Sequence, residues 1–176
     1  MSNLRLRKYG DPILRRKVKW VERVSSKERN LLSNMAKIMH KNEGIGLAAP
    51  QIGVDKRIII VDTGKGLLKL INPQVLEREG KDSLSEGCLS LPEVFVPVNR
   101  ATAIKVEGLN EDKKLTRLII KGFLARVIQH EVDHLNGMLI IDYATEKRME
   151  KIKDNLEKIA NHTKMLGEIE NKGKTK

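Results

Sequence analysis

Residues 122–137 read GFLARVIQHEVDHLNG, and this stretch decides how the chain folds. Apolar residues recur three and four positions apart in it, which predicts a helix from about Gly122 to Asn136 that ends at Gly137. The same helix carries an HExxH motif, His130-Glu131-Val132-Asp133-His134. Histidines four residues apart lie on one helical face, so both imidazoles can reach a single metal ion.

Glu131 lies on the apolar stripe of this predicted helix, together with Leu124, Ile128 and Leu135. A carboxylate that faces a core is costly unless it is paired or protonated, and such a residue usually has a function. In metallohydrolases the glutamate of the motif takes a proton from a metal-bound water. The alternative is a surface helix with two incidental histidines and a solvated glutamate, because HExxH alone also occurs by chance.

A hydrolytic zinc-type site normally takes three protein ligands, so a third ligand must come from elsewhere. One class of zinc proteases continues the motif as HExxHxxGxxH; Gly137 fits, but Ile140 stands where the third histidine would be. Glu146 and Glu150 are acidic candidates, yet they begin a helix whose first turn favours surface carboxylates anyway. Cys88 remains, because a thiolate is a strong metal ligand. The alternative for Cys88 is a buried packing residue.

The flanking sequence predicts an α+β domain. Ser25 and Glu28 form a capping-box pattern that begins a helix ending near Gly44, and a glycine-containing loop follows at residues 44–51. Short strands are predicted at residues 57–62, 69–71, 95–98, 101–107 and 114–120, with a hairpin turn at residues 109–112. We therefore expect short, mostly antiparallel strands around a central HExxH-bearing helix.

An amphipathic helix is expected at the C-terminal end, beginning near Thr145. Its apolar stripe consists of Met149, Ile152, Leu156 and Ile159. We expect one catalytic domain over residues 1–166, followed by a basic, mobile tail over residues 167–176.

Composition narrows the class of protein. A length of 176 residues suits one domain, and a single cysteine excludes an internal disulfide and suits a reducing compartment. The basic N-terminus lacks the apolar segment of a secretory signal, and no apolar run is long enough to cross a membrane, so we expect a cytoplasmic protein. The net charge of +11 favours an acidic partner such as RNA, a ribosome or a membrane surface. Aromatic residues make up only 3%, which counts against an RNA-binding module that stacks bases.

Three segments together resemble the signatures of the peptide deformylase family. They are GIGLAAPQ at residues 44–51, EGCLS at residues 86–90 and QHEVDHLNG at residues 129–137, and they occur in that family's order. A DP-x-L segment at residues 11–14 extends the similarity over nearly the whole chain. The resemblance implies a metal-dependent hydrolase that removes the formyl group from the N-terminal formyl-methionine of newly synthesised proteins and releases formate.

By this resemblance, Cys88, His130 and His134 would bind one divalent metal ion. Iron(II) is implied as the physiological ion, although two imidazoles and a thiolate also suit zinc, nickel or cobalt. Glu131 would accept a proton from the metal-bound water and later deliver it to the leaving amine. Protein biosynthesis, at the stage of N-terminal processing, is the implied context.

The resemblance also assigns residues around the reacting carbonyl. Gln51 would donate its side-chain amide to the developing oxyanion, assisted by the backbone N–H of Leu89. The backbones of Gly46 and Gly87 would bind the substrate as an added strand. The pocket for the methionine side chain is expected at Ile45, Phe123 and Val127.

The partner implied is the nascent N-formyl-methionyl polypeptide, with no membrane and no DNA. The basic C-terminal helix and tail would contact the ribosome; the alternative is a solvated helix that only covers the domain. Three further alternatives stay open: a general zinc endopeptidase with a third ligand other than Cys88, a basic RNA- or ribosome-binding module, and a metal protein without catalysis.

Overall fold

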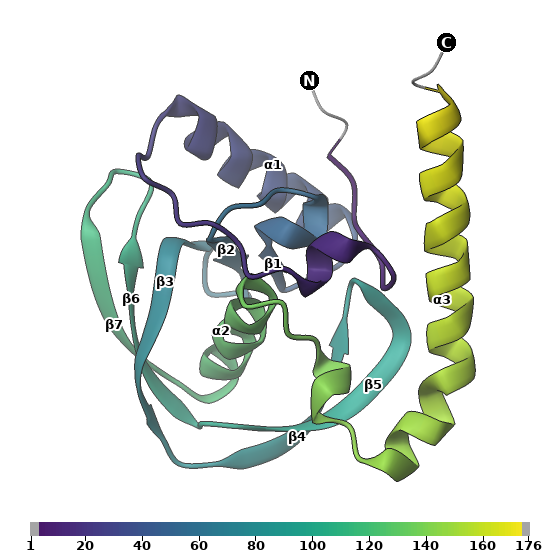
Figure 1. The fold of residues 1–176 in the computed structure, drawn as a ribbon. Helices are drawn as coiled ribbons and strands as arrows, with labels where there is room; N and C mark the ends of the chain where they lie inside the picture. The colour runs from purple at the N-terminus through teal and green to yellow at the C-terminus, as the bar shows by residue number, and fades with distance from the viewer. Residues whose placement is uncertain (1–3, 174–176) are drawn as a thin grey trace.

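The computed structural model describes residues 4–173, which form two antiparallel sheets and three α-helices (Figure 1). The strands of the larger sheet lie in the order β1 (Gly46–Ala48), β2 (Ile58–Val61), β3 (Leu68–Glu79), β6 (Ala103–Leu109) and β7 (Leu115–Lys121). The smaller sheet is a hairpin of β4 (Asp82–Cys88) and β5 (Leu91–Arg100). The predicted α+β class and antiparallel pairing are confirmed.

Helix α2 (Gly122–Leu135) lies among the strands, with the larger sheet on one side and the β4–β5 hairpin on the other (Figure 1). Its residues Ile128 and Val132 share a buried cluster with side chains of the larger sheet. The helix ends at Leu135, one residue before the predicted Asn136, and Gly137 lies just beyond it with a φ of 76°. A Cβ at Gly137 would also lie 2.6 Å from the carbonyl oxygen of Arg15. Both the positive φ and the lack of space for a side chain therefore require glycine here.

Helix α1 (Ser26–Lys41) covers the edge of the larger sheet that contains β1 and β2. The capping box predicted from Ser25 and Glu28 is present. The helix ends at Lys41, and backbone bonds close its last turn: the N–H of Glu43 donates to the carbonyl of His40 at 3.0 Å, and that of Gly44 to the carbonyl of Met39 at 3.0 Å. Gly44 takes part in the stop as predicted, but Glu43, with a φ of 55°, takes the left-handed conformation that glycine usually adopts.

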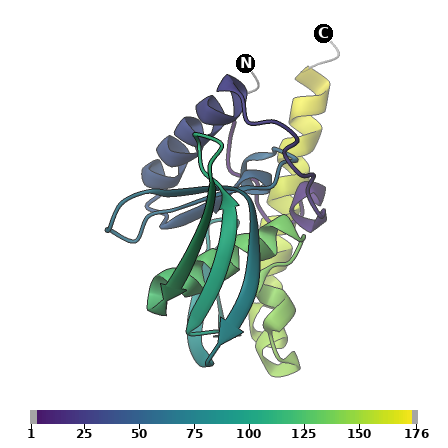
Figure 2. The same ribbon diagram turned by 90° about the vertical axis from the view of Figure 1, so that its left-hand side faces the viewer.

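Helix α3 (Glu146–Gly173) runs along the outside of the domain, and its C-terminal end projects beyond the sheets (Figure 2). Ile152 and Leu156 of the predicted stripe are buried against β5 and the short helix η3 (Ile140–Tyr143). The helix continues through the region expected as a tail as far as Gly173, and residues 174–176 lie outside the described residues. In the described part of the chain, no helix combines the length and apolarity that crossing a membrane requires.

Two parts of the fold differ from the sequence prediction. Strand β4 was not predicted, because its side chains are nearly all exposed and only Glu86 among them is buried. It therefore lacks the apolar alternation that marks a half-buried strand. The segment expected as a loop at residues 44–51 contains β1 and begins the short 3-10 helix η2 (Ala49–Ile52), both buried.

Candidate metal centre

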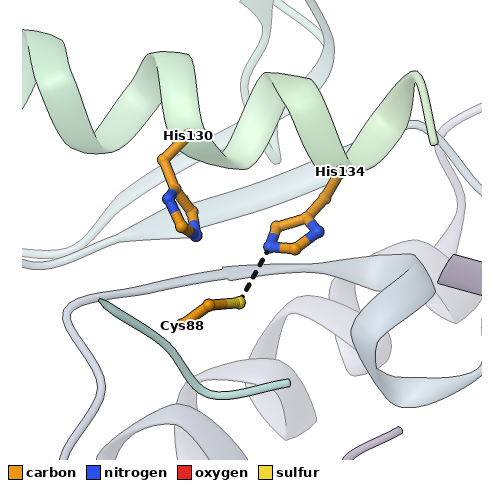
Figure 3. A group of neighbouring side chains, drawn as sticks. All are labelled: Cys88, His130 and His134. Atoms are coloured by element: carbon orange, nitrogen blue, oxygen red, sulfur yellow. Dashed lines mark hydrogen bonds between the residues drawn. The ribbon is translucent and has the colours of Figure 1, made fainter. Parts of the chain in front are cut away.

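Three side chains that could hold a metal ion converge between α2 and the β4–β5 hairpin. One ligand atom each from Cys88, His130 and His134 lies within 4.8 Å of the other two, and Cys88 Sγ is 3.2 Å from His134 Nε2. Figure 3 shows both imidazoles projecting from one face of α2 toward the sulfur. A tetrahedral ion bound at about 2.1 Å by nitrogen and about 2.3 Å by sulfur separates those two atoms by about 3.6 Å. The donor atoms and their spacing therefore fit such an ion.

Glu86 fixes the orientation of one of the imidazoles. Its Oε2 lies 3.0 Å from His130 Nδ1, and because the ionised carboxylate can only accept, Nδ1 carries the proton. His130 Nε2 is thereby left as the ligand atom. This is the usual outer partner of a metal-binding histidine, and it fixes both the tautomer and the ring orientation.

Two arginines hold Glu86 in turn. Arg100 donates to both carboxylate oxygens at 3.0 Å, and Arg126 Nη1 donates to Oε1 at 2.8 Å. Burial alone would raise the pKa of Glu86, but His130 and Arg100 lower it to about 2. Arg100 also reaches Asp133, which accepts a further bond from Tyr143. Glu86 is thus an ionised carboxylate inside a buried network.

The two imidazoles are electrostatically different. Burial alone would lower the pKa of His130, but the Cys88 sulfur and Glu86 raise it well above its ordinary value. The pKa of His134 is well below its ordinary value, first because of burial and then because of His130 and Arg100. The carboxylate and the sulfur thus favour a cation at this position, which is the electrostatic setting that a metal ion requires.

Glu131 lies beside these ligands with only 3% of its surface exposed. Burial raises the pKa of its carboxyl to about 7, with His130 and Arg100 opposing the rise and Glu86 and Asp133 adding to it. Its Oε2 has no hydrogen-bond partner among the described residues. A buried carboxylate oxygen without a partner, at a pKa near neutrality, is suited to receiving and returning a proton.

Gln51 is held so that its amide nitrogen faces the centre. Its Oε1 lies 2.8 Å from the backbone nitrogen of Ala48, which can only donate, so the oxygen must be on that side. Nε2 then lies 3.5 Å from Cys88 Sγ and 3.3 Å from Ser90 Oγ. Leu89 follows Cys88 directly in the turn between β4 and β5.

A cleft of about 450 Å³ opens onto these groups. All the residues expected to bind substrate line it: Ile45, Gly46, Gly87, Phe123 and Val127. The proposed catalytic residues Gln51, Leu89 and Glu131 line it too, whereas His134 is not part of the lining. Ile45 and Phe123 are about half exposed at the mouth, and Val127 is buried.

Sequence reasoning missed the residues that support the ligands. Glu86 stands out in the sequence only as part of the EGCLS segment, and no periodic pattern marks Arg100. Arg126 did carry a signal, because it is a charged residue among the buried positions of α2. Leu84 and Phe95 also line the cleft and are exposed, and nothing in their local sequence distinguishes them from surface residues.

Comparison with known proteins links this arrangement to one family. Residues 3–150 match the family model described as polypeptide deformylase. A curated peptide deformylase from Halothermothrix orenii is 54% identical over 144 residues, covering 81% of this chain and 94% of that protein.

Solved structures give the same result. The crystal structure of peptide deformylase from Thermotoga maritima is 40% identical with a TM-score of 0.79, covering 81% of this chain and 97% of that one. The crystal structure of peptide deformylase from Thermus thermophilus is 36% identical with a TM-score of 0.85, covering 90% of this chain and 98% of that one.

Proposed function

The chain belongs to the polypeptide deformylase family, whose members are hydrolases that remove formyl groups from nascent peptides, and we propose that Cys88, His130 and His134 hold the metal ion with which this chain does so. A bound divalent ion would supply Lewis acidity, which lowers the pKa of water and polarises a carbonyl. Iron(II) is the proposed physiological ion, and zinc, nickel and cobalt suit the same donor atoms. In this proposal α2, which carries both imidazoles, is the element around which the strands are organised.

Glu131 is the proposed proton carrier. Its carboxylate takes a proton from the water that attacks the formyl carbon, and later delivers it to the nitrogen of the leaving methionine. Formate and a free amino terminus result. The pKa of about 7 supports both roles, because such a group gains and loses a proton with little cost near neutral pH.

Gln51 and Leu89 are the proposed donors to the oxyanion. The bond from Ala48 holds the Gln51 amide nitrogen toward the cleft before any substrate arrives. Leu89 contributes its backbone N–H from the turn beside Cys88. A preorganised donor of this kind typically lowers the barrier by about 3 kcal/mol.

The substrate is proposed to enter as an extended strand between Gly46 and Gly87. Side chains are excluded at both positions, since a Cβ at Gly46 would collide with Glu131 and one at Gly87 would lie 2.8 Å from the Phe95 ring. With glycine at both positions, no side chain of these residues covers the backbone groups that an incoming peptide would pair with. The methionine side chain would lie against Ile45, Phe123 and Val127.

One observation carries this proposal: the sulfur and the two imidazoles converge beside a buried carboxyl that faces the cleft. The test is formate release from formyl-Met-Ala-Ser by protein purified without oxygen and loaded with iron(II). Cys88→Ser should lose both the metal, measured by elemental analysis, and the activity. A loaded protein that releases no formate would contradict the proposal, and a Cys88→Ser variant that keeps its metal would favour the endopeptidase alternative.

We also propose that residues 1–166 act as one catalytic domain and that the basic face of α3 contacts the ribosome, where the nascent substrate emerges. The contact would involve exposed lysines of α3: Lys147, Lys151 and Lys158. Replacing these three with glutamine should weaken salt-sensitive co-sedimentation with ribosomes and leave peptide turnover unchanged. The matched control replaces three exposed lysines elsewhere: Lys65, Lys81 and Lys114. Equal loss in both variants would indicate a general charge effect and not a contact through α3.

A further inference from the structure

The N-terminal segment at residues 7–9 contacts both loops that carry the proposed oxyanion donors. The backbone N–H of Arg7 donates to the carbonyl of Gln51 at 2.7 Å, and that of Tyr9 donates to the carbonyl of Ser90 at 2.9 Å. Between them, Lys8 Nζ donates to the carbonyl of Leu89 at 2.6 Å. Three successive residues thus form hydrogen bonds with the backbone of the two loops that contain Gln51 and Leu89.

The turn that Lys8 contacts consists of Leu89 and Ser90, between Cys88 at the end of β4 and Leu91 at the start of β5. The hairpin ladder pairs Cys88 with Leu91. The two turn carbonyls are satisfied instead by Lys8 and Tyr9. A largely buried carbonyl needs such a partner, so the turn conformation depends on the N-terminal segment.

Lys8 also brings charge close to the proposed metal ligand. Its side chain is partly buried, and burial lowers the pKa of the ammonium while the Cys88 sulfur opposes that shift. Because Lys8 Nζ donates to the carbonyl of Leu89, the residue that follows Cys88, its positive charge lies near the sulfur. Inside a protein such an interaction is stronger than in water.

We propose that Lys8 is a positioning residue for deformylation: its hydrogen bond fixes the Leu89–Ser90 turn, and its positive charge lies near the Cys88 sulfur. By fixing Leu89, which lines the cleft, Lys8 holds the proposed backbone N–H donor in place. This inference rests on the proposed function, in which Cys88 binds the metal and Leu89 donates to the oxyanion.

The kinetic test compares Lys8→Met with Lys8→Arg and with Lys153→Met. Methionine keeps the apolar stem and removes the donor and the charge, whereas arginine keeps both. Lys153 is 70% exposed on α3, so its replacement makes the same change in net charge away from the cleft. With formyl-Met-Ala-Ser we expect kcat to fall about tenfold in Lys8→Met, with KM within about twofold, as for lost outer partners of metal ligands. Lys8→Arg should keep at least half of the wild-type kcat, and Lys153→Met should match wild type.

A spectroscopic test does not depend on turnover. In the cobalt(II)-loaded protein, the absorption band in which the thiolate sulfur transfers charge to cobalt should move to lower energy in Lys8→Met, because removing a nearby positive charge raises the energy of the sulfur electrons. The band should return toward the wild-type position in Lys8→Arg and stay unchanged in Lys153→Met.

The outcomes separate the two proposals. If loaded wild-type protein releases no formate, the proposed function fails, and the cobalt band still tests the contact of Lys8 with the sulfur. If wild type is active but Lys8→Met matches Lys153→Met in kcat and in the band, the inference about Lys8 is overturned. A fall in kcat without a band shift, or with a comparable rise in KM, would indicate general loosening of the N-terminal segment and would overturn it as well.

Discussion

At the scale of single residues, Gly46 is the position where one added carbon should most directly disturb the site. Its Cα faces Glu131, so a Cβ would collide with Oε1 and lie 2.9 Å from Val127 Cγ1. Either the carboxyl or the backbone must move. We expect Gly46→Ala to lower kcat/KM for formyl-Met-Ala-Ser by about a hundredfold, the effect of misplacing a reacting group by roughly 1 Å. Metal content, measured by elemental analysis, should be unchanged because no ligand is touched.

The matched control for this substitution is Gly167→Ala. Gly167 lies in α3, and a Cβ there would meet nothing within 4 Å. Alanine should leave kcat/KM unchanged and stabilise the helix slightly. Full activity in Gly46→Ala would show that the carboxyl of Glu131 does not need its observed position.

Glu28 links a buried carboxylate to acid stability. Burial alone would raise its pKa, but hydrogen bonds from Lys56 and Ser25 lower it to about 2, from an ordinary value of 4.5. A carboxyl whose folded-state pKa is depressed stabilises the fold above its unfolded pKa, and this contribution is lost as pH falls through the folded pKa. Glu28→Gln should therefore lower the free energy of unfolding by about 2 kcal/mol at pH 7.

The pH dependence distinguishes this charge effect from lost packing. Glutamine can still accept from the Ser25 N–H, so the part removed is mainly the ion pair with Lys56. Urea unfolding of wild type and Glu28→Gln should give a difference that is constant from pH 7 to about pH 5 and shrinks between 4.5 and 2. A difference of the same size at every pH would assign the loss to packing instead.

Residues in local motifs could be predicted, and their supporting partners could not. His130 and His134 are one helical turn apart, so their spacing predicts that they lie on the same face of the helix. Glu86 meets His130 across a separation of 44 residues, and meets Arg126 across 40. Such contacts are set by how β4 packs on α2, and no periodicity within either element encodes them.

At the scale of elements, Arg100 joins β5 to β4 and α2. It is only 5% exposed and pairs with Glu86 on β4 and Asp133 on α2. Arg100→Met would leave two carboxylates short of a partner in a largely buried position, which costs more than the pair itself contributes. We expect the free energy of unfolding, measured in urea, to fall by about 3 kcal/mol.

The comparison variant for Arg100 is Arg117→Met. Arg117 pairs with Glu107 between β7 and β6, but its side chain is 64% exposed. Surface ion pairs contribute less than about 1 kcal/mol, so this variant should be close to wild type. Similar losses in both variants would mean that burial does not decide the strength of these ion pairs.

The elements that could be predicted are those with an internal pattern. Helix α2 has apolar residues at helical spacing and a glycine after its end, and α1 has its capping box, so both were placed close to their observed bounds. Strand β4 has neither pattern, and it exists because β5 pairs with it from Asp82 to Cys88. Its identity as a strand is a property of the hairpin, which a window along the sequence cannot detect.

At the scale of the whole molecule, the chain brings three segments that are far apart in the sequence to one cleft. The motifs predicted that residues 44–51, 86–90 and 129–137 would meet, through the resemblance they share with one family. They did not predict that residues 7–9 would hold two of these segments, because backbone hydrogen bonds from an extended segment carry no side-chain signature. The length of α3 was also underestimated, since residues 167–173 contain two glycines and a single apolar side chain, which resembles a tail by composition alone.

Helix α3 is expected to have two parts: one that stabilises the domain, and a C-terminal part that does not. Leu156 is buried in a cluster with residues of β5 and η3, so Leu156→Ala should lower the free energy of unfolding by about 3 kcal/mol. Beyond Gly167, the described side chains of Glu168 and Ile169 are exposed. Truncation after Gly167 should therefore leave the thermal midpoint and turnover of formyl-Met-Ala-Ser unchanged.

Thermal unfolding and formate release, measured on both variants, test this division directly. If truncation lowers the thermal midpoint as much as Leu156→Ala does, the end of α3 belongs to the folded domain. If stability and peptide turnover survive truncation while ribosome co-sedimentation falls, the projecting end of α3 serves the ribosome contact. Peptide turnover and ribosome contact would then be separable along one helix, because the buried stripe ends before the chain does.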